Sequence, residues 1–304
     1  MSAIRLGTRG SELARIQANE TADALRAQGL EAELVIITTT GDRDQQSSLL
    51  TIGGQGVFVH ELESALSEKR IDIAVHSAKD VPTELASGTR LCAFLPRADV
   101  RDALISRHGE RLEDLAEGAT VGSSSRRRIA QLKALRPDLK IAELRGNVDT
   151  RLGKLHDGGY DAIVLAAAGM TRLGRGAEVS EFLTIERMLP APGQGAIVLQ
   201  ARADDPSTVA AAASINHEST EVAVRAERAL LEALGAGCTL PVGALAHRSA
   251  DALTLLARVL DDAGERSLTR QRRGDAADPE GLGHALGEEL MMQGAAELLQ
   301  EVLA

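Results

Sequence analysis

The sequence predicts an α/β protein with largely parallel sheets, followed by a small α+β region at the carboxyl end. Three observations support this prediction. Up to about residue 215, short apolar runs alternate with stretches of helical spacing, which is the order that builds strand–helix–strand units. Proline and charged residues interrupt that alternation at two places. Beyond residue 216, strands are grouped between two helices instead of alternating with them.

The alternating part contains apolar runs of strand length and longer stretches whose apolar residues lie three and four apart. The predicted strands span residues 3–6, 33–38, 71–76, 90–95, 103–106, 119–122, 140–144, 162–165 and 196–200. The predicted helices between them span residues 11–28, 57–69, 124–136 and 148–156. The last part is predicted to hold a helix at 218–234, strands near 242–246, 254–260 and 265–272, and a final helix from about 279 to 303.

Two interruptions of the pattern suggest where the chain crosses between domains. The segments LPRADVRD at residues 95–102 and LPAPGQGA at residues 189–196 each break the periodicity. If both are crossovers, the chain leaves a first domain and later returns to it. We therefore predict a first domain of residues 1–95 and 196–215, an inserted second domain of residues 96–195, and a third domain of residues 216–304.

The amino-acid composition argues against nucleic acid as a partner and favours ligands with carboxylate or phosphate groups. The chain has 34 basic and 44 acidic residues and a net charge of −10, which argues against nucleic acid as a partner. With one tyrosine, three phenylalanines and no tryptophan, platforms for stacking bases are excluded. Of the basic residues 29 are arginines, which suit bidentate recognition of carboxylates or phosphates, although a GC-rich genome would produce the same bias.

Cysteine content and hydropathy indicate the compartment. The two cysteines, Cys92 and Cys238, are too few for a disulfide framework or a metal cluster, so we expect no metal site. The first residues, MSAIRLGTRGSELAR, contain no apolar run of signal-peptide type, and no segment approaches the length of a membrane span. We therefore expect a cytoplasmic protein that is not bound to a membrane. No large apolar surface stripe demands a second copy, so we expect a monomer.

The segment HSAKDVP, residues 76–82, directly follows the apolar run IDIAV. Polar residues at the carboxyl end of a parallel strand point into the crevice where α/β proteins bind ligands. Asp80 in such a crevice could accept hydrogen bonds from cationic or N–H groups, or relay protons. An exposed pair of Lys79 and Asp80 with no function is the alternative.

Serine, glycine and arginine follow the predicted strands at several places. In VGSSSRRR, residues 121–128, a helix start with serine caps would leave backbone N–H groups available to an anion. Successive arginines on a helix lie about 100° apart, so only two of the three are expected to share one face. A solvated run of charge is the alternative.

The same pattern recurs in LRGNVDTR at residues 144–151, in MTRL at residues 170–173 and in TRGS at residues 8–11. One arginine after a strand is unremarkable. Four or five arginines that converge on one crevice would bind a ligand with several carboxylates or phosphates.

Two further segments suggest function. The polar, glycine-rich residues 41–58 have the character of a mobile lid or of an ordinary surface loop, and their GGxG lacks the lysine of a nucleotide-binding loop. The turn GAGCTLPVG, residues 235–243, places Cys238 where a thiol is accessible as a nucleophile or an attachment point. The alternative, a small buried apolar residue, fits Cys92 better because that cysteine lies in the run LCAFL.

Seven of these segments, in this order, resemble the porphobilinogen deaminase (hydroxymethylbilane synthase) family, and the resemblance covers almost the whole chain. The segments are TRGSELA, GGQGVFVHELE, DIAVHSAKDVP, VGSSSRRR, LRGNVDTRL, LPAPGQGA and ERALLEALGAGCTLPVG.

The resemblance implies a fold and an activity. Two α/β domains similar to type II periplasmic binding proteins would flank a cleft, and a small α+β domain would follow. Cys238 would hold a dipyrromethane cofactor through a thioether bond. The enzyme would be a transferase that adds four porphobilinogen molecules to this primer with release of ammonia. It would then hydrolyse off hydroxymethylbilane, the linear precursor of haem and other tetrapyrroles.

The resemblance also assigns roles residue by residue. Asp80 matches the catalytic aspartate. The residues implied for the cofactor are Cys238, Lys79, Ser123, Ser125, Arg127, Arg128, Asn147 and Arg151. Those implied for the substrate and the growing chain are Arg9, Ser11, Ser77, Arg145, Arg151 and Arg172. Arg126 stands where an apolar residue is common in the family, and we expect it to point away from the cleft and to be dispensable.

Two rival functions are weighed against this one. A non-catalytic clamp that binds a polyanion would need no cysteine in a third domain, and a periplasmic clamp would need an export signal. A nucleotide- or phosphate-dependent enzyme would need the lysine that residues 53–56 lack.

Overall fold

The computed structural model describes residues 3–38, 59–235 and 240–303, the last four of these as main chain only. Contacts divide the chain into two compact units. The first comprises Met1–Ala98 and Ala196–Glu221, and the second comprises Asp99–Gly195 and Val222–Ala304. The division of the chain into three domains stays a prediction, because residues 99–195 and 222–304 belong to one unit.

The first unit is built on a five-stranded sheet in the order β2-β1-β3-β10-β4. Strands β1, β2 and β3 run parallel, while β10 is antiparallel to both of its neighbours. The strands are β1 (Ile4–Thr8), β2 (Ala32–Ile36), β3 (Ile73–Ser77), β4 (Thr89–Phe94) and β10 (Ile197–Arg202). The helices are α1 (Glu12–Ala27), α3 (His60–Ser67) and α7 (Pro206–Ala213).

Helix α1 shows how the sequence builds this unit. It begins after Ser11, whose hydroxyl accepts a hydrogen bond from the backbone N–H of Ala14 at 3.4 Å. The side chains of Ala18, Ala22 and Leu25 are fully buried in one cluster with residues of the sheet. Small residues on this face let the helix lie close to the strands. Since β1 ends at Thr8 and α1 begins at Glu12, the helix starts at the carboxyl edge of the sheet.

The second unit contains a sheet with the same strand pattern, β7-β6-β8-β5-β9. Here β5 is the antiparallel strand, inserted between β8 and β9. The strands are β5 (Asp102–Ser106), β6 (Thr120–Gly122), β7 (Lys140–Ala142), β8 (Ala162–Ala166) and β9 (Glu181–Leu183). The helices are α4 (Arg126–Leu135), α5 (Val148–His156) and α6 (Ala167–Arg172).

In each five-stranded sheet, the antiparallel strand is the one that the chain enters directly from the other sheet: β5 follows residues 95–101, and β10 follows residues 189–196. This pair of matching sheets is the type II periplasmic-binding-protein architecture that the family resemblance implies. The predicted α/β class is therefore confirmed, with one antiparallel strand in each largely parallel sheet.

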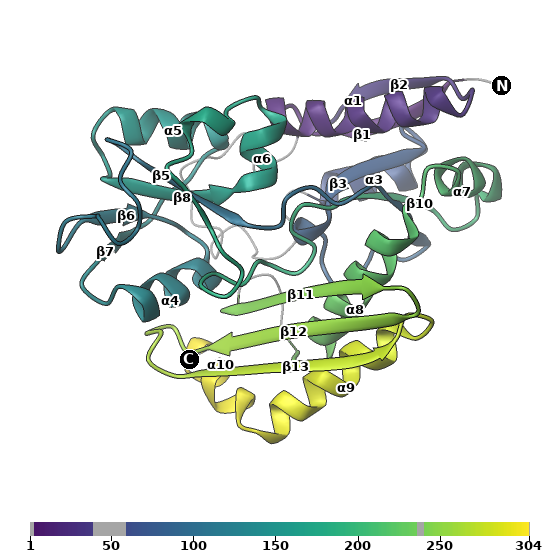
Figure 1. Cartoon of the computed structure of the whole chain (residues 1–304). Coiled ribbons are helices and arrows are strands. Elements are labelled where there is room, and N and C mark those ends of the chain that lie inside the picture. The colour runs from purple at the N-terminus through teal and green to yellow at the C-terminus, as the bar shows by residue number, and fades with distance from the viewer. Residues whose placement is uncertain (1–2, 39–58, 236–239, 304) are drawn as a thin grey trace. The chain divides into compact units, whose positions relative to one another are not determined.

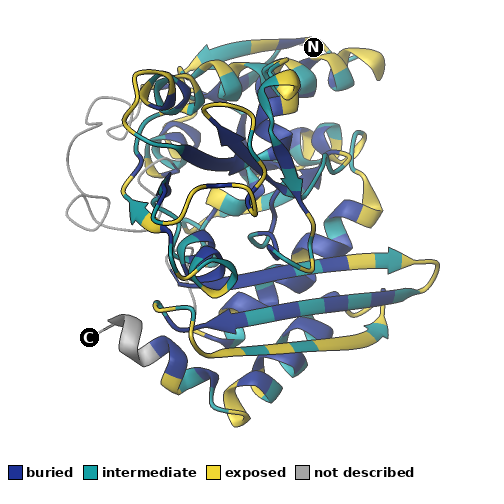
Figure 2. Ribbon diagram, turned by 60° about the vertical axis from the view of Figure 1, so that its left-hand side comes forward, coloured by how far each residue is buried: buried dark blue, intermediate teal, exposed yellow. Residues whose placement is uncertain are grey.

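The rest of the second unit is an antiparallel meander packed on helices (Figure 1). Its strands are β11 (Val242–Ser249), β12 (Ala252–Leu260) and β13 (Ser267–Asp275), and its helices are α8 (Glu218–Ala233), α9 (Pro279–Met292) and α10 (Ala295–Leu303). Buried and half-buried residues alternate along β12, as Figure 2 shows, so one face of this sheet supplies the core. At Gly283 a Cβ atom would lie 2.4 Å from the carbonyl oxygen of Ala226, so only glycine allows α9 to approach α8 this closely.

Two features of the fold differ from the sequence prediction. The final helix is not continuous: α9 ends at Met292 and α10 begins at Ala295. Between them Gly294 adopts a φ of +97°, which a right-handed helix cannot accommodate. Helices α6 and α7 and strand β9 were not predicted, because each is short and two of them are rich in alanine, whose spacing carries little periodic signal.

Candidate active site

Five of the predicted residues lie at one edge of the sheet in the first unit. Arg9 and Ser11 directly follow β1, whereas Ser77, Lys79 and Asp80 end β3 or follow it. Because β1 and β3 are paired and parallel, their carboxyl ends lie at the same edge. The structure therefore brings together these five residues, which lie up to 71 positions apart in the sequence.

Asp80 is exposed at the end of a short 3-10 turn, Ala78–Asp80. The backbone N–H of Ala78 donates to the carbonyl oxygen of Ala196 at 3.0 Å, which fastens the turn to the start of β10. Next to it, Ser77 Oγ accepts a hydrogen bond from Nε2 of the buried Gln17 of α1 at 2.9 Å. The acid is thus exposed to solvent on a turn that two hydrogen bonds hold at its start.

A polar network runs from His76 of β3 across the sheet to Glu63 and Thr89. The Nε2 atom of His76 lies 3.0 Å from Oε1 of Gln200, whose amide nitrogen donates to Glu63 and to Thr89, each at 2.8 Å. Burial lowers the pKa of His76 to about 4, and the hydrogen bond to Gln200 only partly opposes this effect. His76 is therefore uncharged near neutral pH.

The second unit gathers the other predicted side chains. Four of them follow β6: Ser123, Ser125, Arg127 and Arg128. The other four follow β7 or end the helix after β8: Arg145, Asn147, Arg151 and Arg172. Since β7, β6 and β8 are adjacent and parallel, these residues lie at the carboxyl edge of their own sheet. The arginines of this unit therefore lie after strand ends; that they converge on one crevice with Arg9 stays a prediction.

Arg127 and Arg128 converge on a carboxylate that the sequence analysis did not single out. Asp102, at the start of β5, is fully buried, and its oxygens lie 2.7 Å from both guanidinium groups. Burial alone would raise the pKa of Asp102, but the charges of Arg127 and Arg128 and their hydrogen bonds outweigh this effect and hold it well below its usual range. The carboxylate is therefore ionised.

Arg126 lies on another face of α4. Its guanidinium is 3.6 Å from Asp262, whereas Arg127 and Arg128 share Asp102. The prediction that two of the three arginines share a face is confirmed. That Arg126 is dispensable stays a prediction.

Several other predicted residues have local hydrogen bonds. The oxygens of Ser125 and Asn147 cap helices α4 and α5, accepting from the N–H groups of Arg128 at 3.5 Å and Thr150 at 2.9 Å. Arg151 Nε donates to the carbonyl oxygen of Gly146 at 2.7 Å, and Arg172 donates to that of Gly195 at 3.4 Å. These bonds fix the arginine side chains at the edge of the sheet.

The buried Nε of Arg127 has no hydrogen-bond partner in the part of the chain that the structure describes. A buried N–H donor without a partner is costly, so this atom is suited to an acceptor supplied by a ligand. It is the structural feature that most directly fits a carboxylate-bearing group in this unit.

The two cysteines differ in what the structure says of them. Cys238 and the predicted lid at residues 41–58 lie outside the described residues. Cys92 is described: its thiol donates to the carbonyl oxygen of Leu199 at 3.2 Å, and burial raises its pKa to about 12. Cys92 is therefore an unreactive packing residue, as its apolar surroundings predict.

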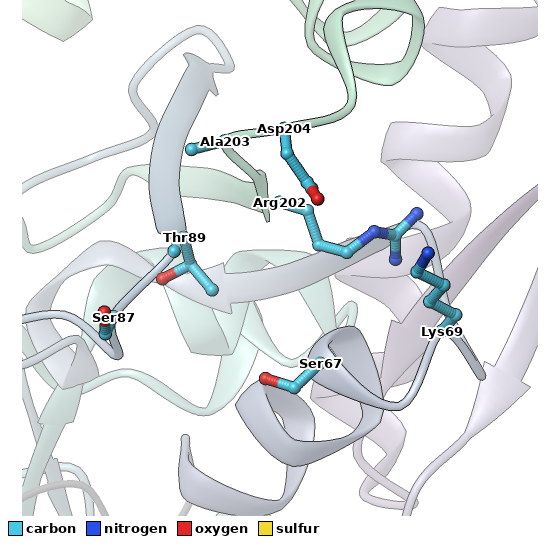
Figure 3. Close-up of a pocket in the computed structure, with 8 residues that line it drawn as sticks. Ser67, Lys69, Ser87, Thr89, Arg202, Ala203 and Asp204 are labelled. Carbon is cyan, nitrogen blue, oxygen red and sulfur yellow. The ribbon is translucent and has the colours of Figure 1, made fainter.

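A hollow of about 300 Å³ lies elsewhere on the first unit (Figure 3). It is bordered by Lys69, Thr89 and Asp204 and by Arg202 at the end of β10. Because β4 begins at Thr89 and the antiparallel β10 ends at Arg202, this hollow lies at the amino edge of the sheet, opposite Asp80. It contains none of the predicted site residues.

Two other kinds of site are absent from the described part of the chain. Within residues 3–38, 59–235 and 240–303, no three histidine, cysteine or acidic side chains are grouped so that they could hold a metal ion. Across the same ranges, every helix is too short or too polar to cross a membrane.

Comparison with known proteins gives a consistent result. Residues 4–210 match the family model "Porphobilinogen deaminase, dipyromethane cofactor binding domain", and residues 222–292 match "Porphobilinogen deaminase, C-terminal domain". The chain is 49% identical to the porphobilinogen deaminase of Acidothermus cellulolyticus, over 99% of this chain and 92% of that protein. It is 48% identical to that of a Roseiflexus species, over 97% of each chain. Among solved structures, it resembles the methionine-binding protein MetQ with a TM-score of 0.43 at 15% identity, over 70% of this chain and 89% of that one.

Proposed function

Because the chain belongs to the porphobilinogen deaminase family, we propose that it joins four porphobilinogen molecules in turn to a covalently bound dipyrromethane primer and releases hydroxymethylbilane. Each addition breaks the bond between carbon and the amino nitrogen of one porphobilinogen and releases ammonia. A carbon–carbon bond to the terminal pyrrole forms, and that pyrrole carbon loses a proton. The observation that carries the proposal is the family match along nearly the whole chain.

The charge of the substrate explains the residues at the two sheet edges. Every pyrrole ring bears an acetate and a propionate, so the growing chain accumulates negative charge. Guanidinium groups at strand ends form paired, charge-assisted hydrogen bonds with carboxylates. We assign this role to Arg9, Arg145, Arg151 and Arg172, and we propose that the hydroxyl groups of Ser11 and Ser77 donate single hydrogen bonds to the same substrate.

The residues present also fit the dipyrromethane cofactor. The partnerless Nε of Arg127 is a donor for a carboxylate, and the start of α4 adds backbone N–H groups. When bound, the dipyrromethane supplies the pyrrole carbon to which the first porphobilinogen is joined. We propose that Cys238 carries it through a thioether bond and that its side chains are held by Lys79, Ser123, Ser125, Arg127, Arg128, Asn147 and Arg151.

Asp80 is the proposed catalytic residue. Its carboxylate lies exposed at the end of the turn after β3, where it can accept hydrogen bonds from pyrrole N–H groups and from the departing amine. Its negative charge would stabilise the positive charge that develops on the substrate carbon as the amine leaves.

The amount of ammonia released tests the proposed function. Purified protein is incubated with porphobilinogen without any nucleotide, and ammonia and hydroxymethylbilane are both measured. We expect four ammonia molecules for each hydroxymethylbilane formed. Binding of porphobilinogen with no ammonia released would support the non-catalytic clamp, and a requirement for ATP would support the nucleotide-dependent alternative.

The oligomeric state and compartment follow from the sequence prediction. We propose that the enzyme acts as a monomer in the cytoplasm. Light scattering coupled to size-exclusion chromatography tests the first part, and we expect a mass near 32.0 kDa plus the cofactor.

A further inference from the structure

The buried carboxylate of Asp102 is the centre of a polar cluster in the second unit. Arg127 Nη1 donates to one of its oxygens at 2.7 Å, and Arg128 donates to the other through Nη2 at 2.7 Å and through Nε at 3.0 Å. The side-chain amide of Gln194 donates to that second oxygen at 3.0 Å. Asp102 and Gln194 have no exposed surface, and the two arginines are 4% and 6% exposed.

Each arginine is fixed by a second contact as well. Arg127 Nη1 also donates to the carbonyl oxygen of Leu189 at 2.7 Å, and Arg128 Nη1 donates to that of Val164 at 3.0 Å. With a backbone carbonyl and Asp102 both holding it, neither guanidinium can turn. The buried Nε of Arg127 is left without an acceptor among the described residues.

Stability alone does not explain this arrangement. Removing three charges from water is costly, and well-packed apolar residues of similar volume are often as stabilising as a buried ion cluster. A buried carboxylate that accepts donors from two adjacent arginines does two other things. It sets the orientation of both side chains, and it reduces their combined charge from +2 to +1, which lowers their mutual repulsion.

Asp102 also joins the arginines to both segments that connect the two sheets. Asp102 itself ends the outgoing segment, residues 95–102, and Gln194 lies in the returning segment, residues 189–196. The same amide of Gln194 donates to the carbonyl oxygens of Val100 at 2.8 Å and Arg101 at 3.2 Å. One carboxylate therefore connects the start of α4 with both connecting segments.

We propose that Asp102 is a positioning residue for the cofactor: without contacting dipyrromethane itself, it presets Arg127 and Arg128 in the orientation that receives the cofactor's carboxylates. The proposal rests on the proposed function. Asp102 governs how readily the apo-protein acquires and retains its primer, and it has little influence on the turnover of molecules that already carry it.

The test compares Asp102→Asn with Asp99→Asn. The substitution at position 102 keeps the size of the side chain but places an amide nitrogen against guanidinium donors, so the arginines lose their fixed orientation. Asp99 is the matched control because its carboxylate lies three residues away in the same connecting segment and pairs with Arg101 at 2.6 Å. The readout is the fraction of protein that carries the cofactor, measured by intact mass, both as purified and after porphobilinogen is added to the apo-protein.

We expect Asp102→Asn to acquire the cofactor on the order of tenfold more slowly than wild type, the size typical of residues that orient a ligand-binding group. Asp99→Asn should match wild type. The KM for porphobilinogen and the kcat of the loaded fraction should stay within about twofold of wild type, because Asp102 does not touch the reacting atoms. Wild-type loading in Asp102→Asn, or a kcat reduced as much as its loading, would overturn the proposal.

A second comparison keeps the test decisive if Asp102→Asn does not fold by itself. Arg127→Gln is compared with the double variant Asp102→Asn/Arg127→Gln, in which the excess positive charge is also removed. In this background Asp102 acts only through Arg128, so the double variant should load more slowly than Arg127→Gln, but by less than the tenfold expected when both arginines are present. A further loss of tenfold or more in the double variant would contradict a role exerted through both arginines. Failure of the proposed function itself would be distinguishable, because wild-type protein would then carry no cofactor mass under any condition.

Discussion

The two five-stranded sheets have the same strand pattern, but their carboxyl edges carry different charged groups. The first presents an exposed acid, Asp80, beside Arg9 and Lys79, and the buried groups that hydrogen-bond its strand end, Gln17 and an uncharged His76, are neutral. The second presents arginines, and the group behind them is a buried, ionised Asp102. The difference shows that matching sheets place functional groups at matching edges, whereas the buried residues near each edge set its local net charge.

The largest effect is expected from neutralising the acid of the first edge. Asp80→Asn keeps the shape of the side chain but removes the charge and the proton acceptor, so turnover should fall by roughly 10²–10⁴. Ammonia release from porphobilinogen measures this effect. The variant should still carry its cofactor by intact mass, because the cofactor arginines belong to the other edge. Near-normal turnover would remove Asp80 from the mechanism.

The next largest effect is expected on cofactor content, and it should differ between variants of Arg127 and Arg126. Most Arg127→Ala protein should be isolated without the cofactor, since the variant lacks a guanidinium that is held by Asp102 and has a partnerless donor among the described residues. Arg126→Ala is the control, because Arg126 pairs with Asp262 on another face of α4. Activity and cofactor mass should be unchanged in that variant. Equal losses in the two variants would contradict the assignment of faces.

The two edges should also respond differently to acid. His76 has its pKa lowered from 6.5 to about 4, so the unfolded chain takes up a proton at pH values where the folded protein does not. Stability should therefore fall as the pH drops from about 6.5 to about 4, by about 3 kcal/mol in total. Asp102 contributes in the same direction only at lower pH, since its pKa is held well below its usual range.

Urea denaturation as a function of pH measures this dependence. His76→Gln should flatten the curve between about pH 4 and 6.5 because it removes the titrating group. An unchanged slope in His76→Gln would show that the fall in stability arises elsewhere in the protein.

The smallest effect is expected from Gln17→Ala. This variant removes the 2.9 Å hydrogen bond that holds Ser77 at the start of the Asp80 turn, and it leaves the turn's bond from Ala78 to Ala196 in place. We expect a loss of about 1 kcal/mol of stability and a rise of a few-fold in KM for porphobilinogen. A loss of turnover as large as that in Asp80→Asn would mean that Gln17 acts on the chemistry directly.

The sequence predicted those features of the site that depend on neighbouring residues along the chain. The apolar run before HSAKDVP and the serines before Arg127 mark strand ends and helix starts, and the structure contains both. The position of Asp102 could not be predicted in this way, since it precedes an apolar run and meets Arg127 and Arg128 only through the fold, 25 and 26 residues away. Gln194 and Gln17 were missed for the same reason: a glutamine in a loop or on a helix gives no pattern that reveals a distant partner.

Whether a strand runs parallel or antiparallel to its neighbours also could not be predicted from its own residues. Both β5 and β10 were predicted as strands, but an apolar run is the same whether its neighbours are parallel or antiparallel. Their direction follows from the chain crossing between sheets and returning.

The roles proposed for both sheet edges require that the cofactor is covalently attached to Cys238. The intact mass of the protein tests this attachment most directly. Freshly purified wild-type protein should exceed its sequence mass by roughly 420 Da, the mass of two porphobilinogens less two ammonias. Cys238→Ser should show the sequence mass alone, with or without added porphobilinogen. Wild-type protein that stays at its sequence mass after incubation with porphobilinogen, or the same adduct on Cys238→Ser, would contradict the account.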